Sequence, residues 1–478
     1  MSSTTDRTTA SAVVLGGSLA GLLAARALAD VAGRVTVVER DALPAGPEPR
    51  RGLPQARHAH QLWSGGARAL EELLPGVTDR LLGAGVRRLP ITTDIVAQSP
   101  YGWYRRWSES HHMLLAGRDL LDATVRAAVL ADGRVEVLER TEVLGLTGTA
   151  TAVTGVRVAA AGRPGAEPPA DDTAGHVLAA DLVVDATGRG SRAARWLTGL
   201  GLPEPRRRTV DSGVAYASRL FRAPEAARGA FPVVNLQPDP RTGEPGRGGV
   251  LLPIEDGQWL VTLFGSRGGE PSTDTGDFAR YARDELRHPV IADLIERAEP
   301  LSEVAFTRTT ANRRLYYERM PAWPEGFAVV GDALCALNPI YGHGMSVAAQ
   351  SALALREVVR RHGPGSPRLA RRVQKAVARP AATAWDLAVG MDVFYPGATE
   401  SGPTLRERLL AAYVGRLLYT ATGNGRIARR VTDVTSLERA APVLVTPGML
   451  LAAAVGPLRP PLEGPPLTAD ELKRAGLQ

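Results

Sequence analysis

The stretch Val13-Val14-Leu15-Gly16-Gly17-Ser18-Leu19-Ala20-Gly21 joins two different hydrophobic patterns. Residues 11–15 form a short apolar run typical of a buried strand, whereas residues 19–28 carry apolar side chains at helical spacing. A second strand-like run follows at residues 35–38 and ends at Glu39. The stretch therefore predicts one β-α-β unit of a parallel, Rossmann-type sheet.

The small residues of this turn fit a phosphate-binding site. Gly16 permits a tight turn and Gly21 lets the helix pack closely on the strand, so that a pyrophosphate reaches the N-terminus of the helix. Ser18 replaces the middle glycine of the usual G-x-G-x-x-G, and its hydroxyl can donate to a phosphate. Glu39 is placed to accept hydrogen bonds from an adenosine ribose. With Gly17 these residues predict dinucleotide binding; a Gly-rich turn without a ligand is the alternative.

A second motif comes much later in the chain. The strand-like run 327–332 ends in Gly331-Asp332, and Gly342-His343-Gly344-Met345 follows. A carboxylate at a strand end can hold the ribityl hydroxyls of a flavin, and a Gly-x-Gly turn that opens a helix lets N–H groups approach the flavin ring. We therefore assign Asp332, Gly342, Gly344 and Met345 to a flavin site. The alternative is a strand-turn-helix junction with Asp332 as its N-cap.

The rest of the chain suggests an α/β (α+β) architecture: a Rossmann-type domain with an inserted antiparallel sheet and a helical C-terminal region. Strand-like runs at 213–221, 249–254 and 259–265 are separated by Gly/Pro-rich loops, with Asp256-Gly257 as a hairpin signal. Residues 440–458 are apolar but interrupted by prolines, so we expect a packed helix rather than a membrane span. The expected parts are a disordered tail (1–10), a cofactor domain in two pieces (11–204 and 311–365), a substrate sheet (205–310) and the helical region (366–478).

Composition excludes several classes. The net charge of +7 comes from a chain in which 55 of 57 basic residues are arginine, scattered rather than clustered, and only 5% of residues are aromatic. We therefore expect no nucleic-acid partner. A single cysteine, Cys335, excludes a disulfide framework, and the N-terminus lacks the pattern of a secretory signal, which fits a cytoplasmic protein. His58-x-His60 has no acidic or cysteine neighbour, so we expect no metal site.

These motifs resemble the flavoprotein monooxygenases with a single FAD-binding domain, a family that includes aromatic hydroxylases and squalene epoxidase-like enzymes. The family's middle signature is similar to Asp185-Ala186-Thr187-Gly188-Arg189-Gly190-Ser191, whereas Cys335 stands where many relatives carry histidine. Over nearly the whole chain, the sequence is more similar still to the olefin epoxidases that act on polyene precursors of polyether antibiotics. The segments that carry this second resemblance are 51–60, 62–68, 214–221, 312–316 and 338–346.

The resemblance implies roles for particular residues. Ser18, Glu39, Arg118 and Asp332 would contact FAD, and Val143 would offer backbone groups to the adenine. Arg40 and Arg51 are assigned to the same cofactor. For the histidines, a hydrogen bond to a backbone group is the alternative to a place in the pocket. The residues assigned to the substrate pocket are Gln55, His58, His60, Trp63, Tyr216 and Tyr341.

The resemblance also implies a reaction. Reduced flavin reacts with O₂ to give a C4a-hydroperoxide, which an alkene attacks without a protein base, so no catalytic side chain is expected. The expected substrate is an apolar polyene or polyketide, either free or carrier-tethered, with NAD(P)H as a transient reductant. A phenol hydroxylase with the same cofactor chemistry and a non-catalytic FAD-binding protein are the alternatives. A flavin-dependent halogenase would need a catalytic lysine and a W-x-W-x-I-P string, and the chain has only Lys375 and Lys473 and lacks the string.

Overall fold

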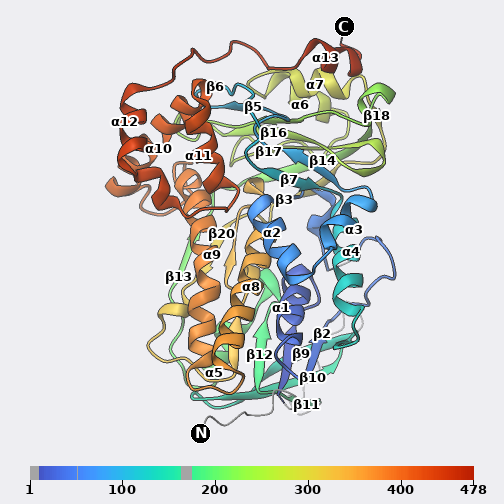
Figure 1. The fold of residues 1–478 in the computed structure, drawn as a ribbon, viewed down its shortest axis with the longest axis vertical. Helices are drawn as coiled ribbons and strands as arrows, with labels where there is room; N and C mark the ends of the chain where they lie inside the picture. Colours follow the sequence, from blue (N-terminus) through green and yellow to red (C-terminus); the bar gives the residue numbers. More distant parts are fainter. Residues whose placement is uncertain (1–9, 51, 163–174, 478) are drawn as a thin grey trace.

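A five-stranded parallel sheet forms the centre of the protein (Figure 1). The computed structural model describes residues 10–50, 52–162 and 175–477, so the expected tail, apart from Ala10, lies outside the described residues. The strands run in the order β21-β12-β1-β2-β8, and every neighbouring pair is parallel, as the glycine-turn stretch predicts. Their bounds are β1 Ser11–Leu15, β2 Arg34–Val38, β8 Val135–Leu138, β12 Leu182–Asp185 and β21 Phe327–Val329.

Helices pack beside this sheet because they share its apolar core. The helix α1 (Leu19–Ala29) connects β1 to β2 and packs against α8 (Gly344–His362), which in turn packs against α9 (Leu369–Asp392). Figure 1 shows α1, α8 and α9 side by side. Nine of the eleven residues of α1 are buried, which explains why its sequence is apolar nearly all round. Two further helices that contribute to this core are α2 (Ser64–Leu73) and α4 (Arg118–Leu130).

A three-stranded antiparallel sheet also packs on the parallel one. Its strands are β9 (Thr141–Gly148), β10 (Val153–Ala160) and β11 (His176–Ala179), with β10 in the middle. Thr141 N donates to Glu39 O over 2.9 Å, so the start of β9 lies beside the end of β2.

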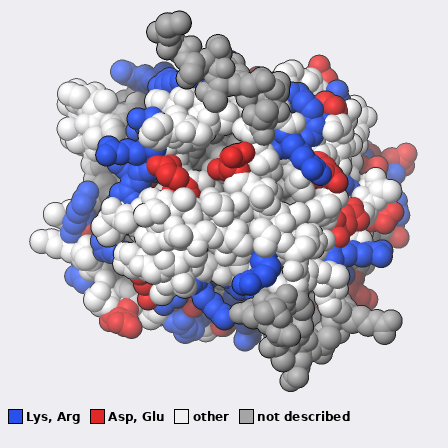
Figure 2. All heavy atoms as spheres, turned by 90° about the horizontal axis from the view of Figure 1, so that it is seen from below, with Lys and Arg blue, Asp and Glu red and all other residues white. Residues whose placement is uncertain are grey.

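At the end of the molecule seen in Figure 2, Arg and Lys side chains are dispersed, with Asp and Glu between them. That face therefore carries charges of both signs.

The large second sheet covers the upper part of Figure 1. It has eight strands in the order β18-β14-β17-β16-β15-β5-β6, with β19 paired to β14. The residues Asp256 and Gly257 both have positive φ, at the turn between β16 and β17, as the hairpin signal predicts. The bounds are β5 Ile95–Ser99, β6 Gly102–Trp103, β14 Ala215–Arg222, β15 Val233–Leu236, β16 Arg247–Pro253, β17 Gln258–Gly265, β18 Glu299–Pro300 and β19 Ala305–Thr307.

Two features of this sheet differ from the expected insertion of residues 205–310. The strands β5 and β6 come from earlier in the chain, and β5 pairs with β15 in parallel, so the sheet is not purely antiparallel. Local alternation of apolar residues cannot reveal such a pairing, because it joins segments more than a hundred residues apart. The helices α6 (Asp277–Asp284) and α7 (Val290–Ile295) cover the core of this sheet.

Two small sheets link the larger ones. One has the order β3-β7-β4, and the other has the order β13-β20-β22. They hold the chain segments that pass between the parallel sheet and the eight-stranded sheet. Their bounds are β3 Gln61–Trp63, β4 Arg87–Pro90, β7 His112–Leu115, β13 Arg207–Val210, β20 Asn312–Leu315 and β22 Cys335–Ala336.

The C-terminal region is helical, as expected. After α9 come α10 (Leu405–Gly423), α11 (Gly425–Thr435), α12 (Pro447–Val455) and α13 (Ala469–Arg474). The part of the chain that the structure describes contains no helix long and apolar enough to cross a membrane. The apolar stretch 440–458 forms a short 3-10 helix and α12, which packs as expected through Met449 and Ala453, whereas its other side is exposed.

Candidate cofactor and substrate site

The turn between β1 and α1 has the geometry that its glycines predict. Gly16 has φ +97°, and a Cβ there would lie 2.8 Å from the carbonyl oxygen of Ala186. A Cβ on Gly21 would lie 1.8 Å from the oxygen of Gly16, so helix and strand are in direct contact. Ser18 is the N-cap of α1, makes no capping bond with its side chain, and no acidic residue stands in the first turn. The helix N-terminus therefore fits a phosphate.

Glu39 lies against this turn. One carboxylate oxygen, Oε2, accepts from Gly17 N over 2.6 Å, and the other, Oε1, accepts from Asp41 N over 2.9 Å. Glu39 is buried, with 8% of its surface exposed. An ionised carboxylate has about four lone-pair sites, so capacity remains for a ribose hydroxyl. The remaining acceptor capacity of Glu39 thus fits the adenosine ribose of a dinucleotide.

An arginine that the sequence analysis missed completes this corner. Arg50 is buried; its Nη2 lies 3.2 Å from Glu39 Oε2, and its Nη1 donates to Gly17 O over 3.0 Å. Its Nη1 also lies 3.3 Å from Asp122 Oδ2, and Arg126 pairs with that carboxylate at 3.3 Å. No motif marks Arg50 in the sequence, because its partners lie directly after β2, on the glycine turn and on α4.

The other assigned arginines take different positions. Arg118, the first residue of α4, donates to Ser18 Oγ over 3.4 Å and lies 3.7 Å from Asp122, which places it at the N-terminus of α1. Arg40 is exposed, and its Nε lies 3.7 Å from Asp41, the only ion pair it makes with described residues. Arg51 lies outside the described residues.

Asp332 is brought to the same place by the fold. A Cβ on Gly331 would lie 2.9 Å from Cβ of Ala20, so the turn after β21 touches the first turn of α1. The side chain of Asp332 is 42% exposed and lies 3.6 Å from Nε of Arg189. Arg189 is itself anchored to the carbonyls of Ala311 and Leu337. The two motifs assigned to the cofactor therefore meet at the carboxyl edge of the parallel sheet, where α/β folds bind ligands.

The middle motif holds Arg189 in position. Asp185 is fully buried and accepts hydrogen bonds from Thr187 N, Thr187 Oγ1 and Ser191 Oγ over 2.6–2.9 Å. Burial raises the pKa of the Asp185 carboxyl, and these three donors oppose that shift. Asp185 thus shapes the loop that carries Arg189. Val143, by contrast, is buried in the core on β9, two residues after the Thr141 contact to Glu39.

The second assigned turn opens α8. Gly342 has φ +64°, and a Cβ there would lie 2.6 Å from Nε2 of Gln61. The helix starts at Gly344, and its second residue, Met345, is buried. Trp63 donates from Nε1 to the carbonyl of Tyr341 over 3.3 Å, which ties this loop to β3. The start of α8 therefore lies beside the segment that carries the assigned pocket residues.

A buried carboxylate that no sequence motif marks organises this loop. Asp392, at the end of α9, is fully buried and accepts from Asn312 Nδ2 at 2.6 Å, Asn338 Nδ2 at 2.8 Å and Tyr341 OH at 2.7 Å. Tyr216 OH donates to Asn338 Oδ1 over 2.7 Å. Burial raises the pKa of Asp392 and those of both phenols. Both hydroxyls are therefore protonated and fixed by acceptors.

The histidines of the site are neutral at physiological pH. Desolvation, aided by Arg57, lowers the pKa of His58 to about 4; its Nδ1 lies 2.8 Å from Ser218 Oγ, and its ring lies 5.8 Å from that of Tyr216. Desolvation lowers the pKa of His60 to about 3 and that of His343 to about 4. His60 and His343 each bond to a backbone carbonyl, at 2.8 and 2.9 Å.

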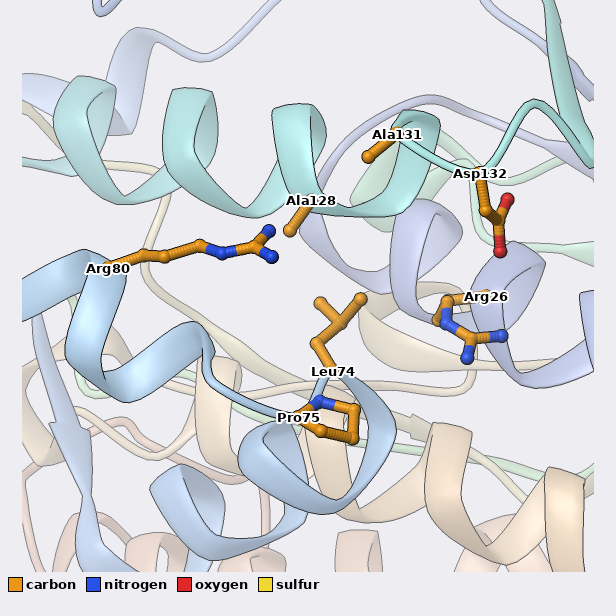
Figure 3. A pocket seen from close by; sticks show the side chains of 7 residues that line it. All are labelled: Arg26, Leu74, Pro75, Arg80, Ala128, Ala131 and Asp132. Carbon is orange, nitrogen blue, oxygen red and sulfur yellow. The ribbon is translucent and has the colours of Figure 1, made fainter.

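Gln55, the last residue assigned to the substrate pocket, and the surface hollow of Figure 3 both lie away from the candidate site. Gln55 is exposed on a short 3-10 helix. Its assignment to the pocket rests on its place close to His58 and His60 in the sequence. A hollow of about 240 Å³ is lined by residues from α1, the end of α4, the α2–α3 connection and α3 (Val77–Gly83), with Arg26 and Arg80 on its two sides (Figure 3). It lies toward the C-terminal ends of α1 and α4, whereas Ser18 and Arg118 lie at their N-terminal ends. This hollow is therefore separate from the candidate site.

Replacing Glu39 with alanine should lower the affinity for FAD. The change removes a carboxylate that fits the ribose, and each charge-assisted hydrogen bond to it contributes about 1.5–3 kcal/mol. The measurement is the Kd of the apoprotein for FAD by flavin fluorescence, with heat-released flavin identified by chromatography. Glu136→Ala, at an exposed pair with Arg34, is the control and should bind normally. Unchanged affinity would place the ribose elsewhere, and release of FMN would contradict the cofactor assignment.

Comparison with known proteins agrees with this geometry. No protein-family model matches the chain. Protein Rv3254 of Mycobacterium tuberculosis (strain ATCC 25618 / H37Rv) is 32% identical to it over 395 residues, which make up 81% of each chain. The structure of the flavin-dependent brominase Bmp2 has a TM-score of 0.64 at 15% identity and covers 89% of this chain and 92% of its own. That of pqsL, a probable FAD-dependent monooxygenase from Pseudomonas aeruginosa, has a TM-score of 0.58 at 18% identity, with 88% and 98% covered. The fold is thus that of flavin-dependent monooxygenases and halogenases.

Proposed function

The chain belongs to the same family as Protein Rv3254 of Mycobacterium tuberculosis, and we propose that it is an FAD-dependent monooxygenase that epoxidises an apolar polyene or polyketide. The observation that carries the proposal is the meeting of two distant motifs, the glycine turn with Glu39 and the corner at Asp332, through the contact of Gly331 with Ala20. This is a cradle for an extended dinucleotide, with an anion site at one end of α1 and carboxylates on both sides.

The described residues suit FAD along its whole length. The N-terminus of α1, with Ser18 and Arg118, would hold the pyrophosphate, and Glu39 the ribose. Asp332 would hold the ribityl chain, and the start of α8 would face the ring. When bound, FAD supplies the reduction of O₂ by electrons from NAD(P)H and the transfer of one oxygen atom to the substrate. NAD(P)H would bind only transiently.

The surrounding side chains favour an alkene over a phenol as substrate. A phenol hydroxylase needs a base for the substrate hydroxyl, but His58, His60 and His343 have pKa values of about 3–4, where an imidazole is a weak base. Tyr216 and Tyr341 already donate to Asn338 and Asp392. The protein's own part would be to orient an apolar chain, whether free or carrier-tethered, and to exclude water. Alkene epoxidation requires no further chemical group from the protein.

The positions of the lysines argue against halogenation. Lys375 is exposed on α9, and Lys473 is exposed on α13 at the far end of the chain. The histidine, tyrosine and glycine-turn residues of the candidate site belong to other elements. With no lysine among them, the site lacks the side chain that a flavin-dependent halogenase would need.

An oxygen-labelling experiment tests the proposal. Incubated with ¹⁸O₂, NADPH, FAD and an apolar polyene with trisubstituted double bonds, the protein should give an epoxide that carries one ¹⁸O atom per oxidised alkene. The control is protein from which flavin has been removed, incubated in the same mixture without FAD, and it should give none. Label in the ring hydroxyl of a phenol, with alkenes untouched, would identify a hydroxylase. A brominated product in the presence of bromide would identify a halogenase, and FAD binding without NAD(P)H oxidation a non-catalytic protein.

A further inference from the structure

Exposed large apolar side chains are concentrated in one part of the molecule. Of the ten that the described residues contain, eight lie between residues 405 and 458. The remaining two, Leu82 and Val177, lie apart from them in the sequence. Scattered single leucines are normal on a protein surface, whereas a concentration of them marks a contact surface. The eight are Leu405, Leu409, Leu410, Val445, Leu450, Leu451, Val455 and Leu458.

The helix α12 presents the densest part of this surface. Its sequence from Pro447 to Val455 contains no charged residue. Met449 and Ala453 are buried toward α10 and α11, whereas Leu450, Leu451 and Val455 are 50–66% exposed. At about 100° per residue, Leu451 and Val455 fall on the face opposite Met449 and Ala453, and Leu450 lies on the flank between the two faces. A helix that is apolar on all sides is normally covered on all sides, so we expect another surface to cover the exposed face of α12.

Arginines surround α12. Arg416 donates from Nε to Ala453 O over 2.7 Å, at the C-terminal end of the helix. A guanidinium nitrogen of Arg426 lies 3.9 Å from the Cβ position of Gly448, near its N-terminal end, and Arg459 directly follows Leu458. All three arginines are exposed, and none has a carboxylate within 4.0 Å in the described part of the chain. Residues 404–462 carry eight arginines and three carboxylates, a net charge of +5, against +7 for the whole chain.

We infer that α12 and its surrounding arginines dock onto an anionic lipid surface. The apolar face would enter the boundary between headgroups and acyl chains, while Arg416, Arg426 and Arg459 pair with phosphates. A helix of nine residues is too short to span a bilayer, which takes about 20, so it would lie in the interface plane. Figure 1 shows α12 at the periphery of the molecule, where a flat surface can reach it.

The positive charge around α12 favours an anionic lipid surface over a second copy of the chain as the partner of this face. In a two-fold dimer the same patch faces itself, so the three arginines would meet the same arginines with no carboxylate between them. An anionic bilayer instead supplies the opposite charge along with the apolar layer. The inference does not depend on the proposed reaction, because the residues that carry it are not among the cofactor or pocket residues.

Vesicle sedimentation of the full-length protein tests the inference. We expect binding to vesicles of phosphatidylcholine with phosphatidylglycerol, at least tenfold weaker binding to phosphatidylcholine alone, and weaker binding as salt is raised. The variant Leu450→Ser/Leu451→Ser/Val455→Ser should lose at least tenfold in partitioning. Val177→Ser, which removes an equally exposed apolar side chain elsewhere, should bind like the parent.

A second variant guards against a folding defect. Arg426→Gln/Arg459→Gln leaves the apolar face intact and should reduce binding to anionic vesicles and its salt dependence while the thermal unfolding midpoint stays unchanged. Three results would overturn the inference: no binding of the parent protein to anionic vesicles at low salt, equal binding of all variants, or a dimer in sedimentation velocity that the triple serine variant abolishes. The last would assign the face to a second copy.

Discussion

Gly21→Ala should give a protein that neither retains FAD nor reaches native stability. A Cβ at this position would lie 1.8 Å from the oxygen and 2.9 Å from the carbonyl carbon of Gly16. Both atoms are backbone, so no side chain can rotate away, and α1 cannot retreat because it packs against α8. We expect a loss of more than about 4 kcal/mol in the free energy of unfolding, which is exceptional for one methyl group. Urea denaturation and the flavin content of the purified protein measure the two effects.

The matched control is Gly199→Ala. Gly199 is also helical, at the end of α5 (Ala193–Gly199), but nothing lies within 4 Å of its Cβ position. Alanine there should be neutral or stabilising by up to about 1 kcal/mol, since alanine is the better helix former. Native stability and full flavin content in Gly21→Ala would show that α1 can shift away from β1. That result would remove the close helix–strand contact as the basis of the phosphate site.

Arg50→Met should be nearly as damaging. The change deletes the cation between Glu39 and Asp122 and leaves two buried carboxylates close together, with Arg118 and Arg126 as the remaining cations near Asp122. Breaking a buried ion pair from one side costs about 3–5 kcal/mol. We expect a loss of that order in unfolding free energy, together with a weakened affinity for FAD, because Glu39 loses a partner that fixes it.

Arg34→Met provides the comparison for Arg50. Arg34 pairs with Glu136 at 2.8 Å, but the two side chains are 73% and 50% exposed. Exposed pairs contribute about 0–1 kcal/mol, so this variant should unfold like the parent and keep its flavin. Equal, small effects in both variants would mean that Arg50 is not part of the site's framework and that the backbone N–H groups of Gly17 and Asp41 are enough to position Glu39.

The sequence predicts those parts of the fold in which neighbours along the chain decide the outcome. The strand, turn and helix around Gly16 follow from short-range apolar patterns and from backbone angles that glycine alone adopts easily. The hairpin at Asp256-Gly257 and the start of α8 at Gly344 follow in the same way. In contrast, β5 joins the second sheet through a partner at residues 233–236, and nothing near residue 95 encodes that pairing.

The candidate site likewise has some residues that the local sequence predicts and others that only the fold brings together. The sequence by itself determined the strand ends and helix starts at which Gly16, Ser18, Glu39 and Asp332 stand, and it is from these local patterns that a cofactor site is predicted there. The tertiary structure alone decided that Arg50 joins Glu39 to Asp122, and that Asp392 holds Tyr341 and Asn338 from a helix more than fifty residues away. The physical reason is that a buried charge must find its partners in space, wherever the chain places them.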